Sequence, residues 1–76
     1  MPQLFDISEG DLFMYAKDDA SEVFKLIKGP DDTGTALARC VLWRNGEDWV
    51  FASRDSDENW NGYANIRKVQ VSVDVI

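Results

Sequence analysis

TALARCVLWRNGEDWVFAS, residues 35–53, is the stretch from which we predict the fold. Two β-prone runs, 35–44 and 47–53, flank the dipeptide Asn45-Gly46. An Asn-Gly pair adopts the two positive φ angles of a type I′ turn at little steric cost, and such turns join the strands of a hairpin. We therefore predict an antiparallel hairpin with Asn45 and Gly46 at its tip.

This turn predicts a register for the hairpin. It pairs Arg44 with Glu47, Leu42 with Trp49, and Cys40 with Phe51. Because side chains alternate along a strand, these residues share one face. That face is apolar except at its tip, so we expect it to lie in the core. The opposite face is half polar, and we expect it to be partly exposed.

The other strands are predicted from alternation and from matched cross-strand pairs. Residues 68–75 place Val at each odd position and polar residues at the even ones, which is typical of a half-buried strand. Residues 12–16 read as a strand, and residues 22–28 as a strand that folds back on it. A turn at 18–21 would place Tyr15 opposite Phe24 and Phe13 opposite Leu26.

Residues 19–28 also carry a helix signature. Asp19 and Glu22 could form a capping box, and Gly29 with Pro30 would end the helix. We favour the strand because the cross-strand matching extends along the whole segment. The long connection from 54 to 65 is expected to be polar, with one helical turn that ends at Gly62.

The fold class that follows is mostly β. We predict a single domain, residues 1–76, in which five strands form an antiparallel meander that closes into a small SH3-like or OB-like barrel. The alternative is an α+β fold in which a short helix at 19–28 packs on a four-stranded antiparallel sheet.

The composition argues against most site chemistry. The chain has no His and one Cys, so the ligands of a zinc site and the usual base for a cysteine nucleophile are missing. Cys40 falls on the predicted core face, where a thiol behaves as a small hydrophobe. We expect no metal, no cofactor and no enzymatic activity.

The net charge of −6 bears on the choice of partner. It argues against direct binding to nucleic acid and to an anionic membrane, and it permits a basic protein partner. No apolar run is long enough to span a bilayer or to form a signal peptide. With a lone thiol, these features lead us to expect a cytoplasmic protein.

The acidic loop at 55–62 resembles the opening of a calcium-binding loop, with oxygen ligands at alternate positions. Trp60 and Ile66, however, stand where an EF-hand needs Gly and a bidentate Glu. We therefore interpret it as a surface loop whose acids bond their own backbone.

The candidate binding residues are aromatics and acids: Trp43, Trp60, Tyr63, Asp55, Asp57 and Glu58. Large aromatics in polar loops give much contact area for little loss of entropy. Trp60 has an alternative role as a lid that folds down to close one end of a thin core.

Three hypotheses of function follow. The leading one is a non-enzymatic acidic module that binds a protein partner, in its sharper form an inhibitor that covers a basic, nucleic-acid-binding surface. The second is a binder of a small ligand, a sugar or a base, through the loop aromatics. The third is a structural subunit that forms a homo-oligomer by pairing an edge strand with its own copy.

Overall fold

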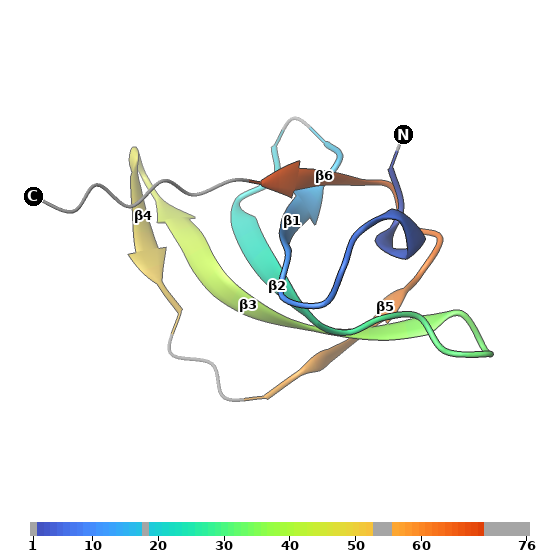
Figure 1. Cartoon of the computed structure of the whole chain (residues 1–76). Helices are drawn as coiled ribbons and strands as arrows, with labels where there is room; N and C mark the ends of the chain where they lie inside the picture. The colour runs from blue at the N-terminus through green and yellow to red at the C-terminus, as the bar shows by residue number, and fades with distance from the viewer. Residues whose placement is uncertain (1, 18, 53–55, 70–76) are drawn as a thin grey trace, which may run out of the picture.

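The computed structural model describes residues 2–17, 19–52 and 56–69 of the 76-residue chain. It contains one 3-10 turn and six strands (Figure 1): η1 (Leu4–Asp6), β1 (Leu12–Tyr15), β2 (Glu22–Lys28), β3 (Thr35–Asn45), β4 (Asp48–Phe51), β5 (Glu58–Asn61) and β6 (Ile66–Val69). The mostly β prediction is confirmed. The α+β alternative is wrong, because residues 22–28 are strand β2. Within the described ranges, no helix is long and apolar enough to cross a membrane.

All strand pairs are antiparallel, in the order β4-β3-β2-β1-β6, with β5 also paired to β3. Strand β3 has eleven residues and accommodates two partners in tandem. Strand β5 pairs with residues 35–38 and β4 with residues 42–45. The two short strands therefore lie at opposite ends of β3 (Figure 1). No pairing among the described residues joins β6 to β4 or β5, so the sheet is not closed.

Strand β5 is the element that the sequence prediction missed. The expected polar connection with a helical turn is wrong for residues 58–61, which form a strand. Glu and Asn are poor strand formers, so local preference argued against it. Pairing with β3 and burial of Trp60 override that preference. The described sheet therefore has six strands, one more than predicted. It is not the predicted simple meander, because β6 pairs with β1 and β5 pairs with β3.

The hairpin of β3 and β4 exists, but its register differs from the prediction by two residues. Leu42 pairs with Phe51, and Asn45 pairs with Asp48. The two central turn residues are Gly46, with a φ of 67°, and Glu47, which has a negative φ. A single positive φ at the first central position is the pattern of a type II′ turn, so Asn45 stays in the strand.

Strands β1 and β2 show the same kind of difference. Phe13 pairs with Phe24 rather than with Leu26. A slip of two residues leaves every side chain on its original face, so alternation alone cannot detect it. Strand β6 begins at Ile66, two residues before the predicted start, and pairs with β1. The rest of the predicted C-terminal strand, residues 70–75, lies outside the described residues.

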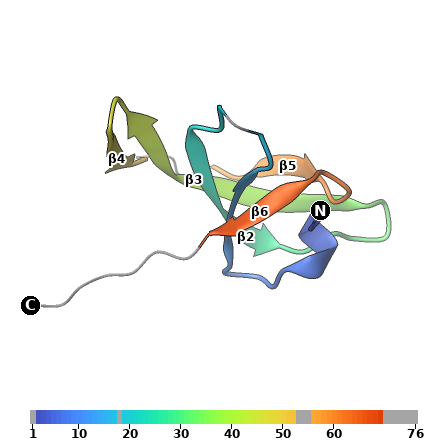
Figure 2. The same cartoon turned by 90° about the horizontal axis from the view of Figure 1, so that it is seen from above.

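Aromatic rings dominate the core. The ring of Trp60, from β5, lies 5.0 Å from that of Phe13 and 4.7 Å from that of Phe24, both edge-on. In a flat sheet, β3 and β2 would separate β5 from β1, with about 4.8 Å between neighbouring strands. These rings meet because the sheet is curled, and Figure 2 shows the curled backbone from above.

The core ends partway along β3. Its buried members are Leu4, Phe13, Phe24, Leu26, Ala36, Ala38, Cys40, Trp60 and Ile66. Beyond Cys40 the same face continues through Leu42 to Trp49 and Phe51, which the sequence predicted to be core. That prediction is wrong: Trp49 is 44% exposed and Phe51 is 88% exposed.

Candidate functional site

The structure distributes the predicted site residues over different parts of the sheet. Trp60 is 5% exposed and belongs to the core, whereas Trp43 is 42% exposed and Tyr63 is 63% exposed. The ring of Tyr63 lies over Gly34, where an added methyl group would come within 3.1 Å of the ring. Trp43 is nine residues further along the extended chain, roughly 30 Å at the usual rise of a strand. The two exposed aromatics therefore cannot contact one small ligand.

The predicted acids do not form one cluster with these aromatics. Asp57 is paired with Arg39, whose Nε donates to Oδ1 of Asp57 at 2.9 Å. Glu58 is a strand residue of β5 opposite Ala38. Asp55 lies outside the described residues. Of the predicted set, Trp43 and Tyr63 are the large exposed side chains, and they mark two separate candidate surfaces.

The first candidate, the hairpin surface, is formed by Leu42, Trp43, Trp49, Val50 and Phe51. Trp49 and Phe51 pair with residues of even number on β3, so they share the face that leads to the core. Trp43 pairs with Val50 and projects from the opposite face. The hairpin thus carries exposed aromatic side chains on both of its faces. Figures 1 and 2 both show it projecting at one end of the molecule, away from η1.

Sequence reasoning placed Trp49 and Phe51 in the core and so missed them as surface residues. Their alternation with Asp48 and Val50 correctly indicates a common face. It does not indicate how far the rest of the chain covers that face. The one available signal is their position next to the turn, where a projecting hairpin extends beyond its neighbours.

The tip of the hairpin is acidic. Glu47 and Asp48 are exposed, while the guanidinium of Arg44 donates from Nε to the carbonyl of Gly46 at 3.0 Å. Glu22 lies across from Trp43 on β2. Among the described residues, Glu47 and Asp48 therefore add exposed negative charge at the tip of the hairpin, in line with the net charge of the chain.

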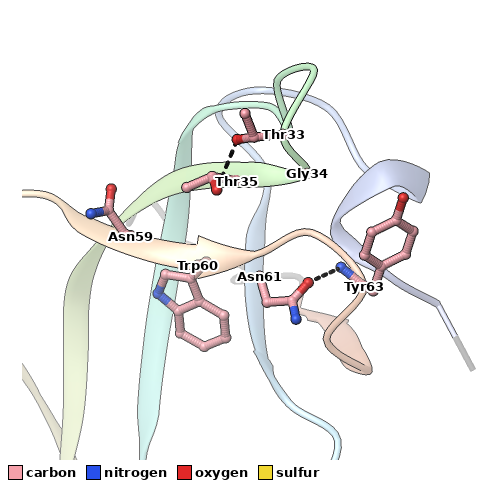
Figure 3. Close-up of a pocket in the computed structure, with 7 residues that line it drawn as sticks. All are labelled: Thr33, Gly34, Thr35, Asn59, Trp60, Asn61 and Tyr63. Atoms are coloured by element: carbon pink, nitrogen blue, oxygen red, sulfur yellow. Dashed lines mark hydrogen bonds between the residues drawn. The ribbon is translucent and has the colours of Figure 1, made fainter.

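The second candidate is an open groove of about 450 Å³, which we call the Thr-Asn groove (Figure 3). It lies where the start of β3, β5 and the turn after β5 meet. Its lining residues are Thr33, Gly34, Thr35, Asn59, Trp60, Asn61 and Tyr63. None of the seven is charged. Cross-strand pairing places Asn61 opposite Thr35, so the polar side chains of β3 and β5 lie side by side on the outer face of the sheet.

The loop that borders this groove is held by Asp31. Its Oδ1 accepts hydrogen bonds from the Thr33 hydroxyl at 2.6 Å, the Thr33 amide at 2.8 Å and the Thr35 amide at 3.1 Å. These bonds, above all the one from the Thr33 hydroxyl, hold the pKa of the Asp31 carboxyl below its usual value. By accepting these hydrogen bonds, the carboxylate of Asp31 holds the loop in its conformation.

Asp11 is a second carboxylate that local hydrogen bonds hold in place. The carboxyl of Asp11 also has a lowered pKa, chiefly because the amide of Ser8 donates to it at 2.9 Å, with Lys68 at 3.5 Å as a further cause. A general acid at neutral pH requires a shift in the opposite direction. Cys40 is buried, as expected, and its Sγ lies 3.4 Å from the carbonyl of Leu42. Across the described ranges, no three His, Cys, Asp or Glu residues are grouped as metal ligands.

Comparison of the chain with protein-family models, with curated proteins and with solved structures gives no match. Its function has therefore to be inferred from its own residues, and the hairpin surface and the Thr-Asn groove are the two places to do so.

Proposed function

We propose that this chain is a non-enzymatic, acidic protein-binding module that binds a basic partner through the hairpin surface. The observation that carries the proposal is Phe51, an aromatic side chain that is 88% exposed on the face that forms the core further along β3. Large aromatics that desolvate on binding contribute much of the energy of protein interfaces. Trp49 shares this face with Phe51, and Trp43 extends the surface to the opposite face of the hairpin.

Charge supports a basic partner. Glu47 and Asp48 at the tip lie beside these aromatics, and the whole chain carries −6. Opposite charge on the partner would accelerate association, because the fields steer the two proteins together before contact. In the sharper form of the proposal, the partner's basic surface is one that binds nucleic acid, and this chain inhibits it by covering that surface.

We also propose that the strands form a small SH3-like or OB-like roll. It is supported by the contacts of Trp60, which bring β5 over the rings of β1 and β2. Such a rigid, curled base would hold the projecting hairpin in one orientation, which lowers the entropy lost on binding.

The test is a pull-down from native lysate with the full chain and two variants, Phe51→Ser and Tyr63→Ala, followed by calorimetry with the purified partner. We expect wild type and Tyr63→Ala to bind the same basic protein and Phe51→Ser to bind it at least about 10-fold more weakly. Equal binding by Phe51→Ser would refute the hairpin surface as the contact. Sedimentation of the chain alone checks for self-association, and a stable dimer lost in Phe51→Ser would favour the homo-oligomer instead.

Electrostatics are tested separately with a double variant, Glu47→Gln with Asp48→Asn. Its control, Asp19→Asn with Asp32→Asn, changes the net charge by the same amount elsewhere. We expect the hairpin pair to slow association and to weaken its salt dependence more than the control pair does. Competition by heparin, a polyanion, tests the inhibitor form: if heparin leaves the complex intact, the partner's nucleic-acid surface is not the one covered.

A further inference from the structure

We infer that the Thr-Asn groove is a second binding site, and that its ligand class is an uncharged sugar. This inference is independent of the proposed protein interface, because β5, which lines the groove, and β4 of the hairpin pair with opposite ends of β3 (Figure 1). It also revises the predicted small-ligand site, which relied on Trp60 and Tyr63 together.

The first observation is an aromatic wall that is held in place. Figure 3 shows the ring of Tyr63 upright at one end of the groove. One neighbour is the ring of Phe5, with centroids 4.9 Å apart and planes tilted by 47°. Another is Gly34, whose missing side chain gives the ring room. A ring supported in this way needs little ordering when a flat apolar face, such as the C–H face of a pyranose, stacks on it.

The second observation is a set of uncommitted polar groups on rigid strands. In the described part of the chain the side-chain amide of Asn59 makes no hydrogen bond. Asn61 uses its Oδ1 to accept the amide hydrogen of Tyr63 at 2.9 Å, so its NH₂ group keeps both donors. Amides that donate and accept suit the hydroxyls of a sugar, which do both as well.

Thr35 adds an acceptor to this set. The single hydroxyl hydrogen of Thr33 is given to Asp31 at 2.6 Å, so the 3.1 Å contact between the two threonine hydroxyls must be donated by Thr35. The hydroxyl oxygen of Thr35 then retains lone pairs. Because Thr35 and Asn61 are cross-strand partners, the acceptor and the NH₂ donors are adjacent.

The third observation concerns charge and size. No side chain that lines the groove is charged, and the chain as a whole is acidic, so phosphate and carboxylate ligands are disfavoured. A volume of about 450 Å³ lies within the range of small-molecule sites. A nucleotide would bring its phosphates without a cation to meet them. A neutral sugar matches all three observations: it can stack on the Tyr63 ring, it can exchange hydrogen bonds with the side-chain amides, and it carries no charge.

The test is an NMR titration of the ¹⁵N-labelled full chain with glucose, galactose, N-acetylglucosamine and their β-linked disaccharides, and with AMP as the charged comparison. We expect at least one sugar to shift the side-chain amide signals of Asn59 and Asn61 and the backbone signal of Gly34. Signals of the hairpin should stay in place.

Single substitutions test whether the sugar binds in the Thr-Asn groove. Asn59→Ala and Tyr63→Ala should each weaken binding about 10-fold, whereas Asn45→Ala and Phe51→Ala at the far end of β3 should leave it unchanged. Tyr63→Phe keeps the aromatic ring that forms the wall. Comparison with Tyr63→Ala therefore separates the loss of stacking from a loss of folding. The inference is overturned if no sugar moves these signals, if AMP binds in place of the sugars, or if Asn59→Ala and Tyr63→Ala bind as wild type does. The hairpin variants of the protein-binding test leave the groove intact, so either proposal can fail alone.

Discussion

Arg39 donates from its Nε to Oδ1 of Asp57 at 2.9 Å, and this ion pair joins the middle of β3 to the residue that precedes β5. The prediction from sequence placed Asp57 in an acidic binding surface. In the structure its charge is already compensated by a neighbouring guanidinium. The acids of the hairpin tip take over that role in the proposed function.

The first prediction concerns this pair. Both side chains are partly exposed, so water and salt screen their attraction, and exposed pairs contribute about 0–1 kcal/mol. We expect Asp57→Asn to lower the free energy of unfolding by no more than about 1 kcal/mol, measured by urea denaturation. A double-mutant cycle with Arg39→Gln isolates the pair. A coupling several times larger would show that the pair is shielded from solvent.

The second prediction concerns Trp60. Its ring contacts Phe13, Phe24 and Tyr15 from across the sheet, so its removal leaves a cavity where three strands meet. Trp60→Ala should cost about 3–5 kcal/mol, a large share of the stability of so small a domain. Phe51→Ala is the control, and it should change stability by less than about 0.5 kcal/mol because the side chain is exposed. Similar costs for both variants would contradict the assigned end of the core.

The third prediction concerns two glycines. A methyl group at Gly62 would lie 2.8 Å from Cγ of Pro30 and 2.9 Å from the carbonyl oxygen of Gly34. Gly62→Ala should therefore destabilise the protein by about 1–3 kcal/mol, since backbone must shift. At Gly29 a methyl group meets nothing within 4 Å. Gly29→Ala should be neutral or stabilising by up to about 1 kcal/mol. Thermal melts compare the two directly, and the reverse order would contradict the close packing at Gly62.

The fourth prediction uses Cys40, which is buried in the core beside Ala38. A thiol reagent should react with the native chain about 10³-fold or more slowly than with the chain in denaturant, because reaction requires opening of the sheet. Ellman's reagent followed by absorbance gives both rates. Trp60→Ala should accelerate the native reaction. Rapid labelling of the folded wild type would instead mean that the thiol is accessible.

The fifth prediction concerns acid. The hydrogen bonds from Thr33 and Thr35 lower the pKa of Asp31 in the folded chain below the ordinary value that it has in the unfolded chain. The stability that results is fully present above the unfolded pKa and is lost as the pH falls through the folded one. Asp31→Asn should therefore destabilise the protein at neutral pH and flatten the acid limb of its stability curve. Asp32→Asn, at a carboxylate with no hydrogen bond within the described ranges, serves as the control and should retain the acid limb.

Some of the candidate site could be predicted from the residues alone. Trp43 and Tyr63 are large aromatics beside polar residues, and both are exposed in the structure. Trp60 stands in an equally polar stretch, yet it is buried, because β5 turns its side chain toward Phe13 and Phe24. Local sequence cannot separate these cases, since the residues that cover Trp60 come from the other half of the chain.

The registers of both hairpins illustrate the same limit. The alternation of side chains fixed which residues share a face, and the pairs of Phe13 with Phe24 and of Leu42 with Phe51 respect it. A slip by two residues preserves that pattern, so the turn and the packing of the rings made the choice.

The residues alone were enough to predict an antiparallel, mostly β chain with a hairpin that turns at Gly46, a buried thiol and an acidic composition. Three features became clear only from the folded chain: where the core ends, that residues 58–61 are a strand, and that one groove is lined by Thr33, Thr35, Asn59, Asn61 and Tyr63. The alternation of side chains along a strand carries information about that strand alone. Burial and the meeting of polar groups depend on strands that are distant in sequence, and these come together only when the sheet curls.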